Sequence, residues 1–417
     1  MSTTSVFFSW WRGADPNARR SLIAAALGWM LDAFDVMIYA MVLSELMSHF
    51  SMSKPTAGLL ASLTLVSSAL GGFIFGLIAD RFGRRRALVW SIIVYSVFTA
   101  ACGLSRTILM LAVFRVCLGL GMGGEWASGA SLVSETWPAA HRGKALGLVQ
   151  SSWAVGYAAA AGVAALVLPR WGWRAVFFVG VLPALLTVWV QKKVREPEIW
   201  ERHVTEVRDR KMKRSAPLRE IFSGPRLKIT VLVTLMNAAT MFGWWGLNLW
   251  IPAYLTSAAD RGGAGLGVKL MSGFVIFMQA GMWLGYVSFG FLSDRFGRKR
   301  SYVFFLVSAA LAVLLYSRAG TPLELFLLGP LVAYFGTGHF SGFGTLTAEL
   351  YPTSVRATAQ GITYNAGRIV SAVSPFVVGS LAASRGFSFA FLVVGLSFLV
   401  AALFWSGIPE TKGRELT

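Results

Sequence analysis

Twelve apolar stretches follow one another along the 417 residues, and they constrain the fold more than any other feature. They cover residues 21–47, 57–79, 87–104, 107–134, 144–168, 174–191, 229–256, 270–292, 301–317, 322–349, 357–382 and 387–407. Each is long enough, or nearly so, to cross the core of a bilayer, which takes about 20 residues of helix. Only 14% of the residues are charged, against about 25% in soluble domains. The sequence therefore predicts an all-α integral membrane protein with twelve transmembrane helices.

The net charge of +19 follows the predicted spans. With the N-terminus on the cytoplasmic side, the inner segments hold 28 of the 38 Lys and Arg residues, and the outer loops hold 8. Basic residues concentrate on the cytoplasmic side of membrane proteins. We therefore expect a multi-pass protein of the cell (inner) membrane, embedded in the lipid bilayer, with both termini cytoplasmic. The charge is a topology signal, so no nucleic-acid partner is expected.

The chain divides into two halves that repeat one another. Residues 192–228 are polar and predict a cytoplasmic linker between six-helix bundles at 1–191 and 229–417. The sequence GLIADRFGRRR at 76–86 returns as GFLSDRFGRKR at 290–300, and ETWPAAHRGKA at 135–145 returns as ELYPTSVRATA at 349–359. Each motif and its copy are separated by the same number of residues, which we call the repeat offset. Duplicated six-helix halves with a site between them are typical of one class of secondary transporter. We expect two pseudo-symmetric bundles around a central cavity, acting as a monomer.

These motifs resemble those of the major facilitator superfamily of transporters, and the resemblance covers essentially the whole chain. The stretch LDAFDVMIYA at 31–40 is similar to the D-G-F/Y-D stretch of organic-acid/proton symporters, with Ala33 in place of glycine. The stretches GMGGEW at 121–126 and SETWPAAHRGKALGLVQSSWAVGY at 134–157 resemble the sialate and lactate/pyruvate branch. The resemblance implies either that branch or the aromatic-acid proton symporters.

Charged residues of the repeated motifs are expected to act as inner gates rather than substrate ligands, because charge pairs at cytoplasmic helix ends can latch neighbouring helices. The residues concerned are Asp80, Arg81, Arg84, Asp294, Arg295, Arg298, Glu135, Arg142, Glu349 and Arg356. Glu135 is expected to pair with Arg142, and Glu349 with Arg356.

Four ionisable residues are predicted to lie at one depth in the membrane. Asp32, Glu125, His339 and Arg368 are ten or eleven residues from the inner ends of their spans. At 1.5 Å per helical residue this is roughly 15–17 Å, half of a core about 30 Å thick. Glu125 and His339 are equivalent at the repeat offset and are expected to face each other across the cavity. Ionisable residues at this depth mark ion and substrate pathways.

Each of these charges has an expected role. Arg368 is expected to bind a substrate carboxylate, because a planar guanidinium binds carboxylates bidentately. Asp32, Asp35 and Glu125 are the candidates for carrying a coupling proton. Asp32 and Asp35 share one helix face, since they are three residues apart, and Arg115 is the expected partner of Asp35.

Aromatic and amide side chains beside these charges are expected to complete the substrate site. The predicted substrate-binding residues are Arg368, His339, Glu125, Asn365, Tyr364, Trp245 and Asn248. The alternative for His339 is a structural role, as a hydrogen-bonded residue that packs between helices. Two further tryptophans of the seventh span, Trp244 and Trp250, are expected to pack or to lie at the membrane interface.

These residues favour a proton-coupled symporter that imports a small organic anion, a monocarboxylate, by alternating access. Its expected partners are the carboxylate and the proton. Two alternatives stay open: a porter of a neutral, sugar-like solute in which Arg368 is structural, and a non-transporting membrane sensor. The sequence has no metal-ligand cluster, nucleophile–base pattern or phosphate-binding loop, so neither an enzyme nor a cofactor is expected.

Overall fold

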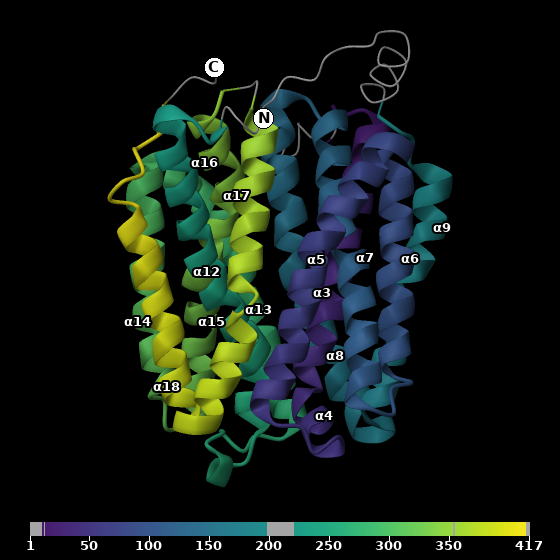
Figure 1. Cartoon of the computed structure of the whole chain (residues 1–417), viewed down its shortest axis with the longest axis vertical. Helices are drawn as coiled ribbons and strands as arrows, with labels where there is room; N and C mark the ends of the chain where they lie inside the picture. Colours follow the sequence, from purple (N-terminus) through teal and green to yellow (C-terminus); the bar gives the residue numbers. More distant parts are fainter. Residues whose placement is uncertain (1–10, 12, 198–220, 353–354, 414–417) are drawn as a thin grey trace, which may run out of the picture.

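Helices are the only regular elements in the part of the chain that the structure describes. The structure is a computed structural model, and it describes residues 11, 13–197, 221–352 and 355–413. Figure 1 shows long helices running side by side, with the first half of the chain gathered on one side and most of the second half on the other.

The described helices fall into two sequential groups. The first comprises α3 (Pro16–Met41), α4 (Leu43–His49), α5 (Lys54–Phe82), α6 (Arg84–Cys102), α7 (Ile108–Thr136), α8 (Ala139–Val179) and α9 (Pro183–Lys193). The second comprises α12 (Gly224–Thr256), η1 (Ala259–Arg261), α13 (Val268–Phe296), α14 (Arg298–Ser317), α15 (Pro322–Gly338), η2 (His339–Gly342), α16 (Phe343–Leu350), α17 (Arg356–Ser371) and α18 (Ser374–Phe404). Residues 224–228, predicted as linker, belong to α12, and linker residues 198–220 lie outside the described part.

Ten stretches of the described chain are helical, long and apolar enough to cross a membrane, whereas the sequence predicted twelve. Two of them, Lys144–Lys193 and Ala359–Phe404, have 50 and 46 residues, more than twice the length that one crossing needs. Each contains a glycine with positive φ, Gly172 at 74° and Gly386 at 83°, a conformation that glycine adopts without strain. The repeat offset separates these two glycines, so the helix breaks at the same place in both halves.

Small residues bring α3 close to α7 and α8. Gly156 of α8 packs against the backbone carbonyl of Met30 on α3, and a Cβ on Gly28 of α3 would lie 2.5 Å from Oε1 of Glu125 on α7. Such contacts need glycine, because side chains would hold the helices apart. They place the middle of α3, with its two aspartates, against the middle of α7 and α8.

The two halves contact each other at the end of the molecule where α4 lies (Figure 1). The hydroxyls of Ser44 and Thr256 are 2.8 Å apart, and Nζ of Lys54 donates to the carbonyl of Ala382 at 3.3 Å. Deeper in the molecule, the Tyr157 hydroxyl on α8 donates to a backbone carbonyl of α12 at 2.8 Å. These bonds tie the halves together on one side of the centre.

Candidate substrate site between the halves

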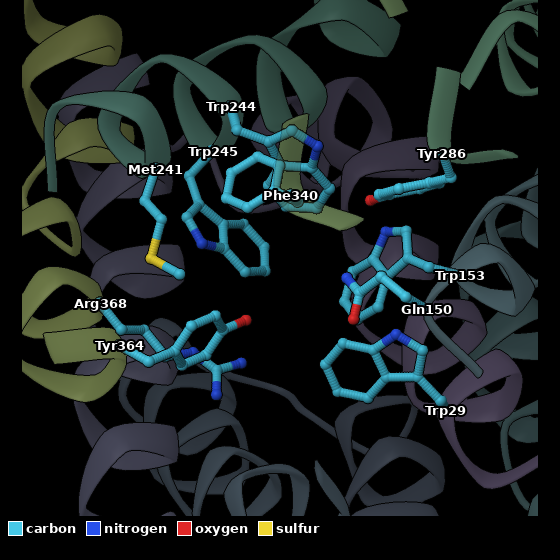
Figure 2. Close-up of a pocket in the computed structure, with 10 residues that line it drawn as sticks. All are labelled: Trp29, Gln150, Trp153, Met241, Trp244, Trp245, Tyr286, Phe340, Tyr364 and Arg368. Atoms are coloured by element: carbon cyan, nitrogen blue, oxygen red, sulfur yellow. The ribbon is translucent and has the colours of Figure 1, made fainter. Parts of the chain in front are cut away.

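A cavity with a mostly aromatic wall lies between the two halves (Figure 2). Its lining consists of Trp29 of α3, Gln150 and Trp153 of α8, Met241, Trp244 and Trp245 of α12, Tyr286 of α13, Phe340 of η2, and Tyr364 and Arg368 of α17. Both halves therefore contribute to one site.

Trp153 joins the aromatic residues of the two halves. Its ring centroid is 4.8 Å from that of Trp29, and it meets Trp244 and Trp245 edge-on at 5.5 and 6.3 Å. The indole N–H groups of Trp29, Trp153 and Trp244 have no hydrogen-bond acceptor among the described residues. Aromatic faces suit a flat apolar ligand, and free indole N–H groups suit one that carries oxygen atoms.

Arg368 is the one charged residue in this described lining. The residue is only 4% exposed, and no salt bridge within 4.0 Å joins its guanidinium to a described carboxylate. Figure 2 shows its guanidinium and the Tyr364 hydroxyl on the same side of the cavity. A buried cation without a close partner is costly, so this position favours the binding of an anion.

Asp32 and Glu125 form a buried acidic pair beside Arg368. Each is 1% exposed, and Asp32 interacts electrostatically with both Arg368 and Glu125. Oδ2 of Asp32 and Oε2 of Glu125 have no hydrogen-bond partner among the described residues. When all three groups are ionised, the cluster carries one uncompensated negative charge. Binding of a single proton to either carboxylate would remove that charge.

Asp35 and Arg115 do not form the ion pair that the sequence predicted. Oδ2 of Asp35 accepts a hydrogen bond from Oγ1 of Thr99 at 3.0 Å. The guanidinium of Arg115 lies 3.8 Å from the centroid of the Tyr39 ring, and no described salt bridge links it to Asp35. The predicted pairing is wrong for this conformation, because a cation–π contact takes the guanidinium instead.

Four predicted pocket residues lie outside the cavity wall, and three of them contact backbone carbonyl groups of the preceding helical turn. His339, Asn248 and Asn365 contact the carbonyl oxygen four residues earlier, at 3.3, 2.9 and 3.0 Å respectively. His339 also packs against the rings of Tyr302 and Phe340. It therefore does not face Glu125 across the cavity, and Glu125 itself lies behind the wall, against α3.

The observed cavity wall contains some of the residues that the sequence predicted and others that it did not. Arg368, Tyr364 and Trp245 line the cavity, and so does Trp244, which was expected to pack elsewhere. The missed residues are Trp29, Gln150, Trp153, Met241, Tyr286 and Phe340. Two of them had a signal, because Trp29 shares a helix face with Asp32 and Gln150 is the one amide in its span.

Two matching ion pairs tie helix ends together at the end of the molecule opposite α4 (Figure 1). Arg84 at the start of α6 binds Glu135 of α7 through Nη2 at 2.9 Å and Nε at 3.1 Å. Arg298 at the start of α14 binds Glu349 of α16 through Nη2 at 2.9 Å and Nε at 3.2 Å, and Nη1 also binds Asp294. The repeat offset relates one pair to the other, residue by residue.

The described partners of these glutamates are not the ones that the sequence predicted, and the predicted pairings stay predictions. Glu135 and Glu349 are bound by arginines of the first motif, whereas Arg142 and Arg356 were expected. The side chains of Asp80, Arg142 and Arg356 lie outside the described part of the chain. Arg81 and Arg295 are exposed and lie over the rings of the phenylalanines that follow them.

Two glutamates that the sequence analysis missed bind the same helix starts. Oε2 of Glu196 accepts the backbone N–H of Arg85 at 3.1 Å. Glu410 accepts those of Arg298 at 2.8 Å and Lys299 at 3.1 Å. Partial burial alone raises the pKa of Glu410, but backbone N–H groups outweigh burial and lower it. The repeat offset relates the two glutamates and could have identified them.

The spans, the repeat and a cavity between the halves define a membrane transport protein rather than an enzyme. The chain belongs to the Major Facilitator Superfamily, which it matches over residues 25–288 and 239–416. It is 33% identical over 408 residues to a putative metabolite transport protein of Haemophilus influenzae, covering 95% of this chain and 97% of that one. It is 29% identical over 385 residues to a cis,cis-muconate transport protein of Acinetobacter baylyi, covering 92% of each.

The fold is also that of a solved transporter. A crystal structure of a D-xylose-proton symporter has a TM-score of 0.75 at 21% identity, covering 95% of this chain and 99% of the other. At this identity the likeness concerns the fold alone.

Proposed function

We propose that the protein is a proton-coupled symporter that imports a small, flat monocarboxylate by alternating access. The observation that carries the proposal is the unpaired guanidinium of Arg368 in an otherwise uncharged, mostly aromatic lining. A carboxylate can bind the guanidinium bidentately while its apolar body packs against Trp153 and Trp245. The relative from Acinetobacter is named for cis,cis-muconate, a flat, conjugated dicarboxylate, which supports a flat organic anion as the substrate.

Proton coupling is proposed to reside in Asp32 and Glu125. An anion bound at Arg368 neutralises the guanidinium that interacts with Asp32, so two buried carboxylates then face each other without a cation. Such an arrangement is unfavourable unless a proton enters with the substrate. Asp35 and Arg115 are retained as a second proposed part of the proton path, because both are buried at 1% exposure in the same half.

The transport cycle is proposed to use twelve crossings in two six-helix bundles, residues 1–191 and 229–417. Breaks at Gly172 and Gly386 divide two of the ten long stretches into two crossings each. The number of membrane crossings is then twelve. With both termini cytoplasmic in the inner membrane, the arginine–glutamate pairs lie on the inner side. The contacts between Ser44 and Thr256 then lie on the outer side. The proposed functional unit is a monomer.

Uptake by purified protein in proteoliposomes tests this proposal. The panel consists of benzoate, 4-hydroxybenzoate, lactate, sialate and D-xylose, with and without an inward proton gradient. We expect gradient-driven accumulation of the flat carboxylates and none of D-xylose, which offers no charge to Arg368. Accumulation of D-xylose alone contradicts the proposal and favours the neutral-solute porter. Binding of a carboxylate without any transport favours the sensor.

Loss of the inner ion pair is expected to change the transport rate and to leave equilibrium substrate affinity unchanged. Glu349→Gln removes the charge that Arg298 binds, and both side chains are about one-tenth exposed, at 10% and 11%. The pair joins helix ends that lie away from the cavity. Its loss is therefore expected to shift the balance between inward- and outward-open states without changing the substrate contacts. Transport rate and equilibrium binding are measured on the same preparation.

Glu324→Gln is the matched control for this prediction. Glu324 is an exposed glutamate in the capping box at the start of α15, and glutamine can fill the same role. We expect it to behave as the wild type. A large loss of affinity in Glu349→Gln with a normal rate would contradict the gating role.

A further inference from the structure

A second cavity lies inside the C-terminal half, beside the first. It is bounded by α12, α13, α15 and α18. The two polar residues of its described lining, Asn248 and Thr337, are bonded to carbonyl groups of their own helices at 2.9 and 2.5 Å. The remaining side chains of this lining are apolar. The space therefore suits an apolar group.

Trp244 separates the second cavity from the substrate site, since its side chain belongs to both walls. Along α12, Met241 and Trp245 face the first cavity, whereas Asn248 and Ile251 face the second. The second cavity is therefore about one helical turn, or roughly 5.4 Å, further along α12. Figure 2 shows Trp244 across the first cavity from Arg368. The indole N–H has no described acceptor, so rotation of the ring breaks no hydrogen bond.

Gly336 of α15 keeps the second cavity open. A Cβ at this position would meet only Phe398, at an ordinary contact distance of 3.8 Å. At Gly338 of the same helix, a Cβ would lie 2.6 Å from the ring of Phe305, and at Gly329 it would lie 2.7 Å from the side chain of Met278. Tight packing thus explains those two glycines but not Gly336. Glycine in a helix interior is destabilising relative to alanine, so Gly336 preserves space at a cost to the helix.

We propose that the second cavity is a subsite for the apolar end of a carboxylate whose carboxyl group is bound at Arg368. The inference rests on the proposed function and adds that substrates are selected by the length and polarity of the end opposite the carboxyl group. Rotation of Trp244 admits a ring substituent or hydrocarbon tail into the space beside Gly336. A charged tail is disfavoured, because the described lining has no charged side chain and the indole N–H of Trp244 is its one polar group without a described partner.

Equilibrium binding of benzoate and of 4-methyl-, 4-ethyl-, 4-propyl- and 4-butylbenzoate tests the subsite. The measured quantity is the ratio of the Kd of 4-butylbenzoate to that of benzoate. We expect Gly336→Ala to raise this ratio about tenfold, since one methylene in an apolar pocket changes discrimination by roughly 10–200-fold. Gly273→Ala is the control, because Gly273 is exposed on α13 and a Cβ there meets nothing within 4 Å.

A second variant changes the ratio in the opposite direction. Trp244→Leu joins the two cavities and is expected to lower the ratio several-fold. An identical ratio in the wild type, Gly336→Ala and Trp244→Leu overturns the subsite, while continued binding of benzoate leaves the proposed function intact. If the wild type binds none of the benzoates, the proposed function is wrong and the subsite falls with it.

Discussion

Arg368→Lys is expected to weaken binding of the carboxylate substrate by about 10–100-fold while the protein still folds. Lysine keeps the positive charge but cannot donate two parallel N–H bonds from a planar group. Hydrogen bonds to charged groups contribute about 1.5–3 kcal/mol, which corresponds to the expected range of affinity. Because Arg368 is only 4% exposed, water cannot readily take the place of the lost bonds.

A double-mutant cycle on both partners makes this prediction specific. Replacing benzoate by benzamide removes the carboxylate charge and should weaken binding to the wild type. The same replacement should cost little more in Arg368→Lys, because the interaction is already lost. Arg385→Lys is the control, since Arg385 is exposed and its guanidinium lies over the Phe389 ring. Full additivity of the two losses would exclude the proposed pairing.

Asp32→Asn and Glu125→Gln are each expected to abolish proton-driven accumulation while substrate exchange continues. An amide is permanently neutral, so the halves can reorient with substrate bound but no proton is released afterwards. The two carboxylates are buried and interact with each other, and Asp32 also interacts electrostatically with Arg368. We therefore expect each variant to equilibrate substrate across the membrane without concentrating it.

Counterflow and gradient-driven uptake in proteoliposomes separate these two activities. Asp35→Asn is expected to impair folding or gating as well, because Asp35 accepts the hydrogen bond of Thr99. Glu45→Gln, at an exposed position on α4, is the control for loss of a carboxylate. If the three intramembrane amides still accumulate substrate with a normal pH dependence, these carboxylates are not the proton path.

The sequence alone determined the class of protein and the repeat, and it predicted one depth for the charges. Hydropathy and basic-residue bias act along the chain, so they predict membrane spans without knowledge of how the spans pack. The repeat offset relates the two arginine–glutamate pairs, and it also relates the breaks at Gly172 and Gly386. Depth follows from counting residues in a helix, and it identified Arg368 before any packing was known.

Only the tertiary structure decided which side chains form the cavity wall. Apolar residues surround a membrane span on every side, so periodicity does not distinguish the face toward the cavity from the face toward neighbouring helices. Trp153 and Tyr286 come from different halves and meet at the cavity only when α8 and α13 pack together. His339 has the predicted depth of the cavity, yet its ring contacts the carbonyl of Phe335 near the end of α15. The partner of a polar side chain depends on the direction in which that side chain points and on the residues nearest to it. Both are fixed only when the helices pack.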